Sequence, residues 1–172
     1  MSGFELHLNS IGEGKGVATY VKTGEMRPKN NIKNPQAQIS LLSSADLDVV
    51  NVYRSQGMNN AELAEQLENI IDKSKLTVIC GDFNLCYIED RDNEVTRMLE
   101  NIGFTQLVSE ATHYKGRHID HVYSNHDVKC IQVDVSLYSP YYLAKDHDAI
   151  CITIIKVPEQ ILPGRGKYSV KK

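Results

Sequence analysis

The sequence predicts a layered α/β domain. Short runs rich in β-branched and aromatic residues alternate with two amphipathic segments, and charged or amide residues gather where the apolar runs end. The first kind of run is typical of strands and the second of helices, so we expect helices packed on sheets. Polar groups at strand ends are the usual location of sites in such domains. With 172 residues, 41% of them hydrophobic, the chain is long enough for one domain with a buried core.

The predicted strands are short apolar runs bounded by turn residues. They cover residues 16–22, 38–42, 47–53, 76–80, 119–123, 131–137 and 149–157. The run 76–80 is continuously apolar and ends on a glycine, which indicates a strand buried on both faces. Residues 23–35 are polar and interrupted by proline and glycine, so we expect a loop there.

Two segments have the periodicity of helices. Apolar residues recur every three or four positions over 59–71, where Asn59 and Glu62 have the spacing of a capping box. The same periodicity over 95–102 predicts a second helix, which Gly103 closes at a position where a left-handed cap is easiest.

The distribution of charge excludes a uniformly basic surface for nucleic acid. The formal net charge is −3, and residues 156–172 hold five basic residues and one acid, or +4, which leaves −3 − 4 = −7 for residues 1–155. We expect one domain over residues 1–157 and a basic, flexible tail over residues 158–172, where prolines and glycines accumulate.

The cysteines and the N-terminus indicate an intracellular protein. The four cysteines are unevenly spaced, and Cys80 and Cys151 lie inside apolar runs, so we expect reduced core thiols rather than a disulfide framework. The N-terminus lacks a cationic segment followed by a long apolar one, and no run approaches membrane-spanning length. We therefore expect an intracellular protein with no membrane partner. The nucleus is one candidate compartment.

Three acid-bearing elements lie in or beside predicted strands. Asp82 and Asn84 follow one strand directly, and residues two apart point the same way, so both are expected to enter one cleft. Such residues also favour ordinary turns. Asp120 interrupts an apolar strand, where a solvated strand face is the alternative. Asp146 and His147 stand just before the last predicted strand, where a purely structural polar pair is the alternative.

The order of these elements resembles the endonuclease/exonuclease/phosphatase superfamily. Its later motifs are similar to residues 81–84 (Gly-Asp-Phe-Asn), 119–121 (Ile-Asp-His) and 146–147 (Asp-His). Residues 52–54 are similar to the family's tyrosine-bearing strand, and residues 14–21 to its glycine-started strand. The resemblance extends over nearly the whole chain and implies the deoxyribonuclease-I-like fold, a layered α/β sandwich.

The resemblance implies roles in phosphodiester hydrolysis for four residues. Asp82 matches the general base that activates water, and Asn84 matches its hydrogen-bonding partner at the phosphate. His147 matches the histidine that neutralises the scissile phosphate, and Asp120 the carboxylate that fixes the histidine tautomer and keeps it charged. Negative charge concentrates on oxygens in the transition state, where such groups must converge.

A metal and a phenol complete the implied site. Asp146 is similar to an acidic metal ligand and Tyr53 to a phosphate-contacting phenol. Oxygen ligands favour Mg²⁺ or Mn²⁺ over zinc. Three nearby histidines faintly resemble zinc-hydrolase signatures but depart from any complete pattern, so we expect surface or loop positions for them. They are His113, His118 and His121.

Within the superfamily, the run 111–120 looks most like endonuclease modules of mobile elements, which implies DNA as the partner. Two alternatives stay open: a phosphatase acting on a small phosphorylated substrate, and a non-catalytic nucleic-acid-binding module that retains the fold. Two interpretations are also open for the turn 115–117: it contacts a nucleic-acid backbone, or it is a solvated basic turn.

The chain departs from the family pattern at its start. Complete domains begin with an asparagine-bearing strand, a helix and a strand ending in Gln-Glu, whose glutamate is a principal metal ligand. Neither Glu5 nor Glu13 has that context, so the ligand is not transferred to either. We expect an N-terminally truncated fold, or one segment of a longer polyprotein, which an upstream domain or partner chain completes. The isolated chain is then expected to be a weak enzyme.

Overall fold

The computed structural model describes residues 3–12, 15–133 and 146–154. The elements in chain order are β1 (Phe4–Gly12), β2 (Lys15–Lys22), β3 (Arg27–Asn34), β4 (Ala37–Ser43), β5 (Leu47–Arg54), α1 (Asn60–Ile70), β6 (Leu76–Asp82), α2 (Glu94–Asn101), β7 (Thr105–Gln106), β8 (Asp120–Ser124), β9 (Lys129–Val133) and β10 (Ala149–Thr153). The predicted layered α/β fold is confirmed.

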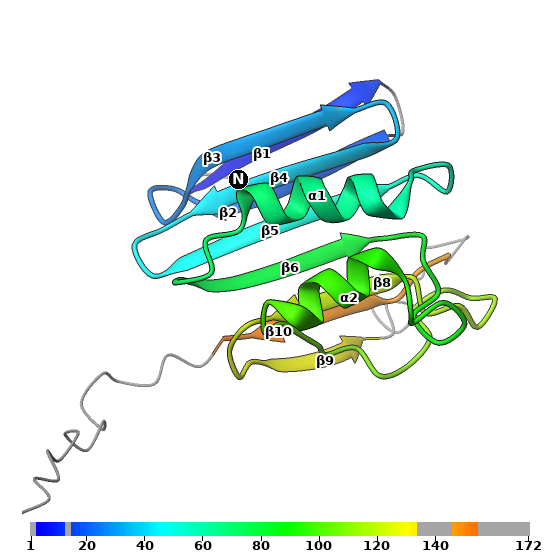
Figure 1. The fold of residues 1–172 in the computed structure, drawn as a ribbon. Coiled ribbons are helices and arrows are strands. Elements are labelled where there is room, and N and C mark those ends of the chain that lie inside the picture. The colour runs from blue at the N-terminus through cyan, green and yellow to red at the C-terminus, as the bar shows by residue number, and fades with distance from the viewer. Residues whose placement is uncertain (1–2, 13–14, 134–145, 155–172) are drawn as a thin grey trace, which may run out of the picture.

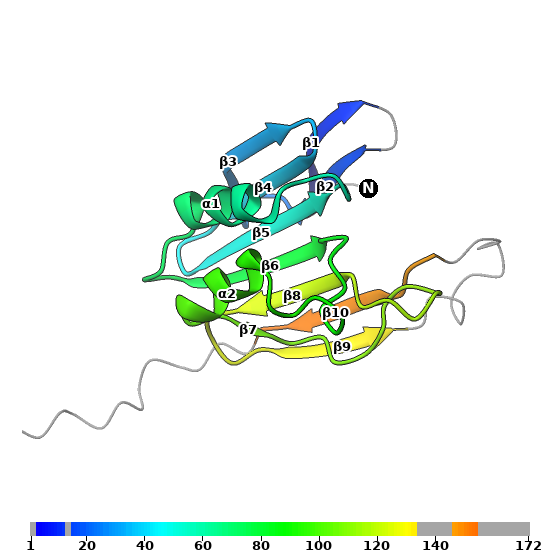
Figure 2. The same cartoon turned by 45° about the vertical axis from the view of Figure 1, so that its right-hand side comes forward.

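A six-stranded mixed sheet forms the central layer. Its strand order is β3-β4-β5-β6-β8-β7, with β5 and β6 parallel and the other neighbours antiparallel. Both helices cover one face, and the two-stranded sheets β1–β2 and β10–β9 lie on the other (Figures 1 and 2). Because helix α1 joins two parallel strands, the C-terminal ends of β5 and β6 meet at one edge of the layer.

The main core lies between the sheet and the helices. β5 alternates between buried and half-buried residues, and its Val50 and Val52 join the same apolar cluster as Leu63 and Leu67 of α1. Tyr123 of β8 is fully buried in that cluster. Each buried aliphatic side chain of this kind contributes about 2 kcal/mol to folding, so this cluster fixes the helices on the sheet.

The opposite face is covered at its two ends. The β1–β2 pair packs over β3, β4 and β5, where the buried amide of Asn9 donates to the carbonyls of Ile32 and Ile39 at 2.9 and 2.8 Å. At the other end, Ile150 and Ile152 of β10 join an apolar cluster on β6 and β8. The strand 76–80 is thus buried on both faces over its middle, as predicted.

The structure confirms most predicted strands, corrects two predictions and adds two strands. Residues 23–35 are no simple loop, because β3 forms there as an exposed edge strand with a bulge beside Pro28, a place that tolerates proline. The short strand β7 and the N-terminal strand β1 were not predicted. Cys151 is a free thiol but is exposed on β10 rather than buried in the core.

Both predicted helices form with side-chain caps. The Asn59 carboxamide accepts from the backbone N–H groups of Ala61 and Glu62, as its spacing predicts. The Glu62 carboxylate instead accepts from the Asn34 side chain at 2.7 Å, so only half of the capping box is present. After α2, Gly103 has φ +92°, the left-handed geometry expected of its glycine.

Several predictions fall on residues outside the described ranges. These are the ends of two predicted strands, 134–137 and 155–157, and the expected tail over residues 158–172, so the domain boundary stays a prediction. Among the helices that the structure describes, none is both long enough and apolar enough to cross a membrane.

Candidate active site

The register of the central sheet gathers three of the predicted site residues at one edge. Tyr53 at the end of β5 pairs with Asp82 at the end of β6, and Asp82 pairs with Asp120 at the start of β8. Residues that pair across neighbouring strands lie about 5 Å apart. The polar side chains predicted from separate parts of the sequence are therefore neighbours along this edge.

The turn after β6 fixes Asp82 and Asn84 against each other. Gly81 has φ +139°, and a β-carbon there would collide with the backbone carbonyl of Val52, so glycine lets β6 approach β5 closely. Asn84 has φ +48°, a left-handed conformation that asparagine tolerates. Its backbone N–H and side-chain amide donate to the two Asp82 carboxylate oxygens at 2.9 and 3.2 Å.

Arg54, at the end of β5, stabilises this turn through hydrogen bonds. The sequence analysis did not predict this role. Its guanidinium is 4% exposed and donates to the carbonyl of Phe83 at 3.3 Å and to the side chain of Asn60 at 2.8 Å. Its own carbonyl accepts from the Asn84 side-chain amide at 2.7 Å. The only signal in the sequence is a cation directly after an apolar strand, which is too common to single out.

Asp120 and His147 form a hydrogen-bonded ion pair. The Nδ1 atom of His147 lies 2.8 Å from Asp120 Oδ2, and Asp120 is held in turn by a hydrogen bond from its backbone N–H to the hydroxyl of Thr112 at 3.1 Å. Burial on its own lowers the pKa of His147, but the hydrogen bond and the charge of Asp120, aided by Asp82 and Asp146, raise it on balance. The imidazole is thus biased toward its protonated form.

Burial raises the pKa of the Asp82 carboxyl above its usual range. The nearby carboxylate of Asp120 adds to this rise, while the backbone hydrogen bond from Asn84 and the charges of His147 and Arg117 oppose it. A carboxylate with a raised pKa is a stronger base than an ordinary one. This is the direction that suits proton abstraction from water.

Asp146 and Tyr53 border this centre. Asp146 is exposed, its carbonyl accepts from the backbone N–H of Tyr114 at 3.0 Å, and its charge raises the pKa of the adjacent His147. Tyr53 is half-buried beside Asp82 in the register of the sheet. The structure thus brings all six predicted residues together at the end of the sheet where β5 and β6 end. They are Tyr53, Asp82, Asn84, Asp120, Asp146 and His147.

The expectation of surface or loop positions is wrong for His121, which lies inside β8. His118 lies in the irregular segment before β8, as expected of a loop, but it is not at the surface. His118 and His121 are each 1% exposed. The His121 ring stacks on Phe83 at 4.8 Å between centroids, and its Nε2 bonds the carbonyl of Leu85 at 2.9 Å, so it braces the turn after β6 from the core. His113 is half-buried, and its ring meets the His147 ring edge to face at 5.0 Å.

The oxygen donors at this edge fit a hard cation only in part. Among the described residues, no group of three or more His, Cys, Asp or Glu side chains is placed to hold a metal ion. Magnesium, however, commonly takes one or two carboxylates and completes its shell with water. Burial and, to a lesser extent, the neighbouring Asp120 carboxylate raise the pKa of Asp82, and a divalent cation would relieve this unfavourable burial of negative charge.

Comparison with known proteins gives the family. The model of the Endonuclease/Exonuclease/phosphatase family matches residues 7–151, which is most of the chain. The chain belongs to this family. Its members are hydrolases of the nuclease and phosphatase kind and generally depend on divalent metals. No curated protein sequence matches this chain.

Solved structures of the family share the fold at low sequence identity. The endonuclease domain of TRAS1, a telomere-specific non-LTR retrotransposon, is 13% identical, with a TM-score of 0.60 over 90% of this chain and 79% of that one. An AP endonuclease from Archaeoglobus fulgidus is 17% identical, with a TM-score of 0.61 over 90% and 80%. A family protein from Leptotrichia buccalis is 16% identical, with a TM-score of 0.58 over 91% and 73%. At these identities the likeness establishes the fold.

Proposed function

We propose that this family hydrolase is a divalent-metal-dependent DNA endonuclease of the mobile-element kind. The observation that carries the proposal is the arrangement of a half-buried base, Asp82, beside the ion pair of Asp120 and His147 at one sheet edge. The retrotransposon and AP endonucleases among the similar structures support DNA as the substrate class.

In this proposal Asp82 takes a proton from the attacking water. The water oxygen bonds to phosphorus, the ester P–O bond breaks, and the leaving oxygen receives a proton from solvent. Protonated His147 neutralises a non-bridging phosphate oxygen, and Asp120 keeps that imidazole charged and oriented. Asn84 orients Asp82, and Tyr53 donates to the phosphate. Asp146 and Asp82 would hold a divalent ion, which supplies further neutralisation of phosphate charge.

A substrate panel tests the proposal. The chain is incubated with plasmid DNA, an abasic duplex and phosphomonoesters, each with Mg²⁺, Mn²⁺ or a chelator. We expect nicking of plasmid or abasic DNA that needs the metal and is lost in Asp82→Ala and His147→Ala. Hydrolysis of the monoesters alone would instead establish the second candidate, a small-substrate phosphatase, which the same residues can serve.

The absence of a three-ligand metal group among the described residues favours a third candidate, a non-catalytic binding module. Thermal unfolding with increasing Mg²⁺ separates it from the enzyme. A metal-binding chain should melt at higher temperature as Mg²⁺ rises, because a ligand that binds only the folded state stabilises it by mass action. A melting temperature that ignores Mg²⁺, together with DNA binding and no nicking, identifies a binding module.

A further inference from the structure

A basic, aromatic turn lies beside the His147 segment, and none of its side chains takes a step in the proposed reaction. Residues 114–117 (Tyr-Lys-Gly-Arg) form this turn, and Gly116 in it has φ +74°, a left-handed conformation that suits glycine. The Gly116 N–H donates to the carbonyl of His113 at 2.9 Å, and the Thr112 and His113 N–H groups donate to the carbonyl of Arg117 at 3.1 and 3.0 Å. The turn is therefore closed at its base.

The backbone also ties this turn to the segment that carries His147. The Tyr114 N–H donates to the carbonyl of Asp146 at 3.0 Å, and the Asp148 N–H donates to the carbonyl of Thr112 at 2.7 Å. His113 and His147 form a β-bridge, with their rings 5.0 Å apart. A group bound at His147 therefore has the turn as its immediate, fixed neighbour.

The side chains of the turn differ in kind from those of the site. The centre contains the carboxylates Asp82 and Asp120, which repel a polyanion, whereas the turn supplies two cations and an aromatic ring. Tyr114 is 63% exposed, and the Lys115 ammonium lies 5.3 Å from its ring centroid. Arg117 is half-buried, and its bridge to His113 holds it at the base of the turn, beside the segment that carries His147.

An exposed aromatic ring beside cations can bind the bases and phosphates of a nucleic-acid strand. A small phosphate ester has no neighbouring nucleotides to contact them. Bases stack on exposed aromatic rings, and lysine and arginine neutralise backbone phosphates. We infer that the turn 114–117 is a polynucleotide-binding element that holds the nucleotides flanking the scissile phosphate, with Tyr114 stacking on a base or sugar and Lys115 and Arg117 binding neighbouring phosphates. This inference rests on the proposed function and restricts its substrate to polynucleotides.

Binding of a fluorescently labelled DNA duplex tests the inference without requiring turnover. Fluorescence anisotropy gives Kd over a range of NaCl for wild type, Tyr114→Ala, Lys115→Ala and Arg117→Gln. We expect Tyr114→Ala to weaken binding about tenfold with little change in salt dependence. Each loss of a cation should reduce the slope of log Kd against log salt by about 0.9. Tyr114→Phe keeps the ring and should restore binding.

Matched controls come from the far side of the molecule. Tyr20 on β2 is as exposed as Tyr114, and Lys33 lies exposed on β3, at the sheet edge opposite β8 and β7. Tyr20→Ala and Lys33→Gln should bind DNA as wild type does. Unchanged Kd and salt slope in all three turn variants, with unchanged thermal unfolding, overturn the inference.

Turnover separates failure of this inference from failure of the proposed function. The ratio of DNA nicking to hydrolysis of bis(p-nitrophenyl) phosphate should fall in the turn variants, since the small diester has no flanking nucleotides. If wild type hydrolyses neither substrate, the proposed function fails while the binding data still decide the role of the turn. If wild type nicks DNA and the ratio stays constant across the turn variants, the inference fails alone.

Discussion

At the residue scale, the proposed mechanism depends on the ion pair of Asp120 and His147. If the carboxylate acts only through the imidazole, Asp120→Ala and His147→Ala should each lower DNA nicking by roughly 10²- to 10⁴-fold, and the double variant should lose no more than either alone. Single-turnover nicking rates for the three variants complete the cycle. Losses that multiply in the double variant would show that the two residues act independently.

In the proposed mechanism, the same pair and Asp82 set the pH dependence of activity. His147 must be protonated to neutralise phosphate, and its raised pKa keeps it so to higher pH, so the basic limb of kcat/KM should lie above an ordinary histidine's pKa of about 6.5. Asp82 must be ionised, and its raised pKa puts the acidic limb above the ordinary aspartate value. Asp120→Asn removes the charge that raises the pKa of His147, so the basic limb should move to lower pH. A pH–rate profile of that variant checks this, and an unmoved limb contradicts it.

The site residues predicted from sequence were those with a motif around them. Asp82, Asn84, Asp120 and His147 were found because they lie in three segments whose order along the chain resembles that of the family's motifs. Arg54 was missed because its importance comes from burial and from hydrogen bonds to carbonyls about 30 residues away, which no local pattern encodes. The roles of all six predicted residues stay predictions until the variants are assayed.

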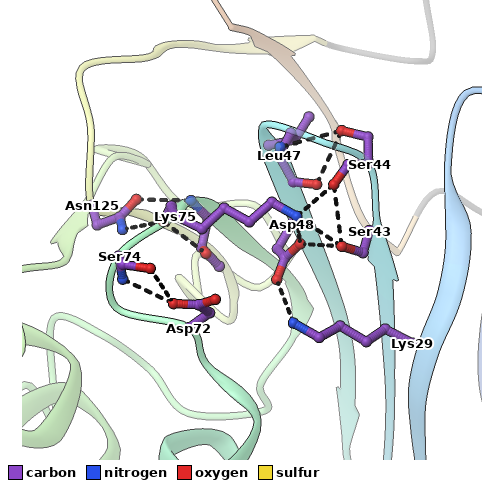
Figure 3. Close-up of polar contacts among 10 residues, drawn as sticks. Lys29, Ser43, Ser44, Leu47, Asp48, Asp72, Ser74, Lys75 and Asn125 are labelled. Atoms are coloured by element: carbon purple, nitrogen blue, oxygen red, sulfur yellow. Dashed lines mark hydrogen bonds and ion pairs between the residues drawn. The ribbon is translucent and has the colours of Figure 1, made fainter.

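At the element scale, a buried carboxylate at the start of β5 joins four parts of the fold. Asp48 is 1% exposed, and Figure 3 shows its carboxylate between the Lys75 ammonium at 2.6 Å, the Ser43 hydroxyl at 2.6 Å and the Lys29 ammonium at 3.5 Å. These residues come from β3, β4, β5 and the segment before β6. Lys75 also donates to the carbonyl of Ser44. The cluster fixes the end of the sheet opposite the candidate site.

Removing one charge from this cluster should destabilise the fold. Asp48→Asn leaves Lys75, which is 16% exposed, without its counter-charge, and breaking a buried pair in this way costs about 3 kcal/mol. Urea unfolding of the variant measures the loss, and Glu65→Gln on the exposed side of α1 is the control that should unfold like wild type. A loss no larger than the control's contradicts a structural role for the cluster.

The sign of the pH effect follows from the pKa of Asp48. Burial raises it, but hydrogen bonds from Lys75 and Ser43 and the charges of both lysines lower it on balance. A depressed pKa contributes stability that is present above the unfolded value of about 3.9 and is lost as the pH falls through the folded value. The gap in unfolding free energy between wild type and Asp48→Asn should thus be constant at neutral pH and shrink below about pH 4.

The elements that sequence patterns predicted were those whose apolar periodicity is strong. The helices and the strands of the main core follow from spacing alone, because burial of one face demands it. β3 was taken for a loop since its residues are mostly polar and include Pro28, and it forms because β4 offers a partner along its full length. Such an edge strand depends on a tertiary partner that the segment itself does not reveal.

At the scale of the whole molecule, the layer opposite the helices is incomplete among the described residues. Within this part of the chain, β1–β2 and β10–β9 are each two-stranded, so each pair has two edges without a backbone partner. On β5, at the border of the area that β2 covers, Val49 and Asn51 stay half-exposed while Val50 and Val52 on the other face are buried. The prediction that an upstream domain or partner chain completes the fold came from the departure from the family pattern; these unpaired edges support it, and it stays a proposal.

The outer face of β1–β2 adds an apolar surface to these edges. Phe4, Leu6 and Leu8 are 53%, 50% and 59% exposed, and Tyr20 lies opposite Leu6 in the register at 65% exposed. A contiguous patch of this kind beside an unpaired strand edge is where another chain associates. The protein should therefore self-associate as its concentration rises, at the cost of solubility.

Placing charges on that face should reverse the association. Leu6→Lys with Leu8→Lys keeps the alternation of the strand, leaves the buried Asn9 contacts in place and replaces the apolar stripe with mutual repulsion between copies. Sedimentation velocity from low to high protein concentration should show larger species for wild type and a single small species for the double variant. Ile88→Lys changes an equally exposed apolar residue outside the strands and serves as the control that should associate like wild type. If the double variant associates as strongly as the control, the outer face of β1–β2 is not the surface through which copies associate.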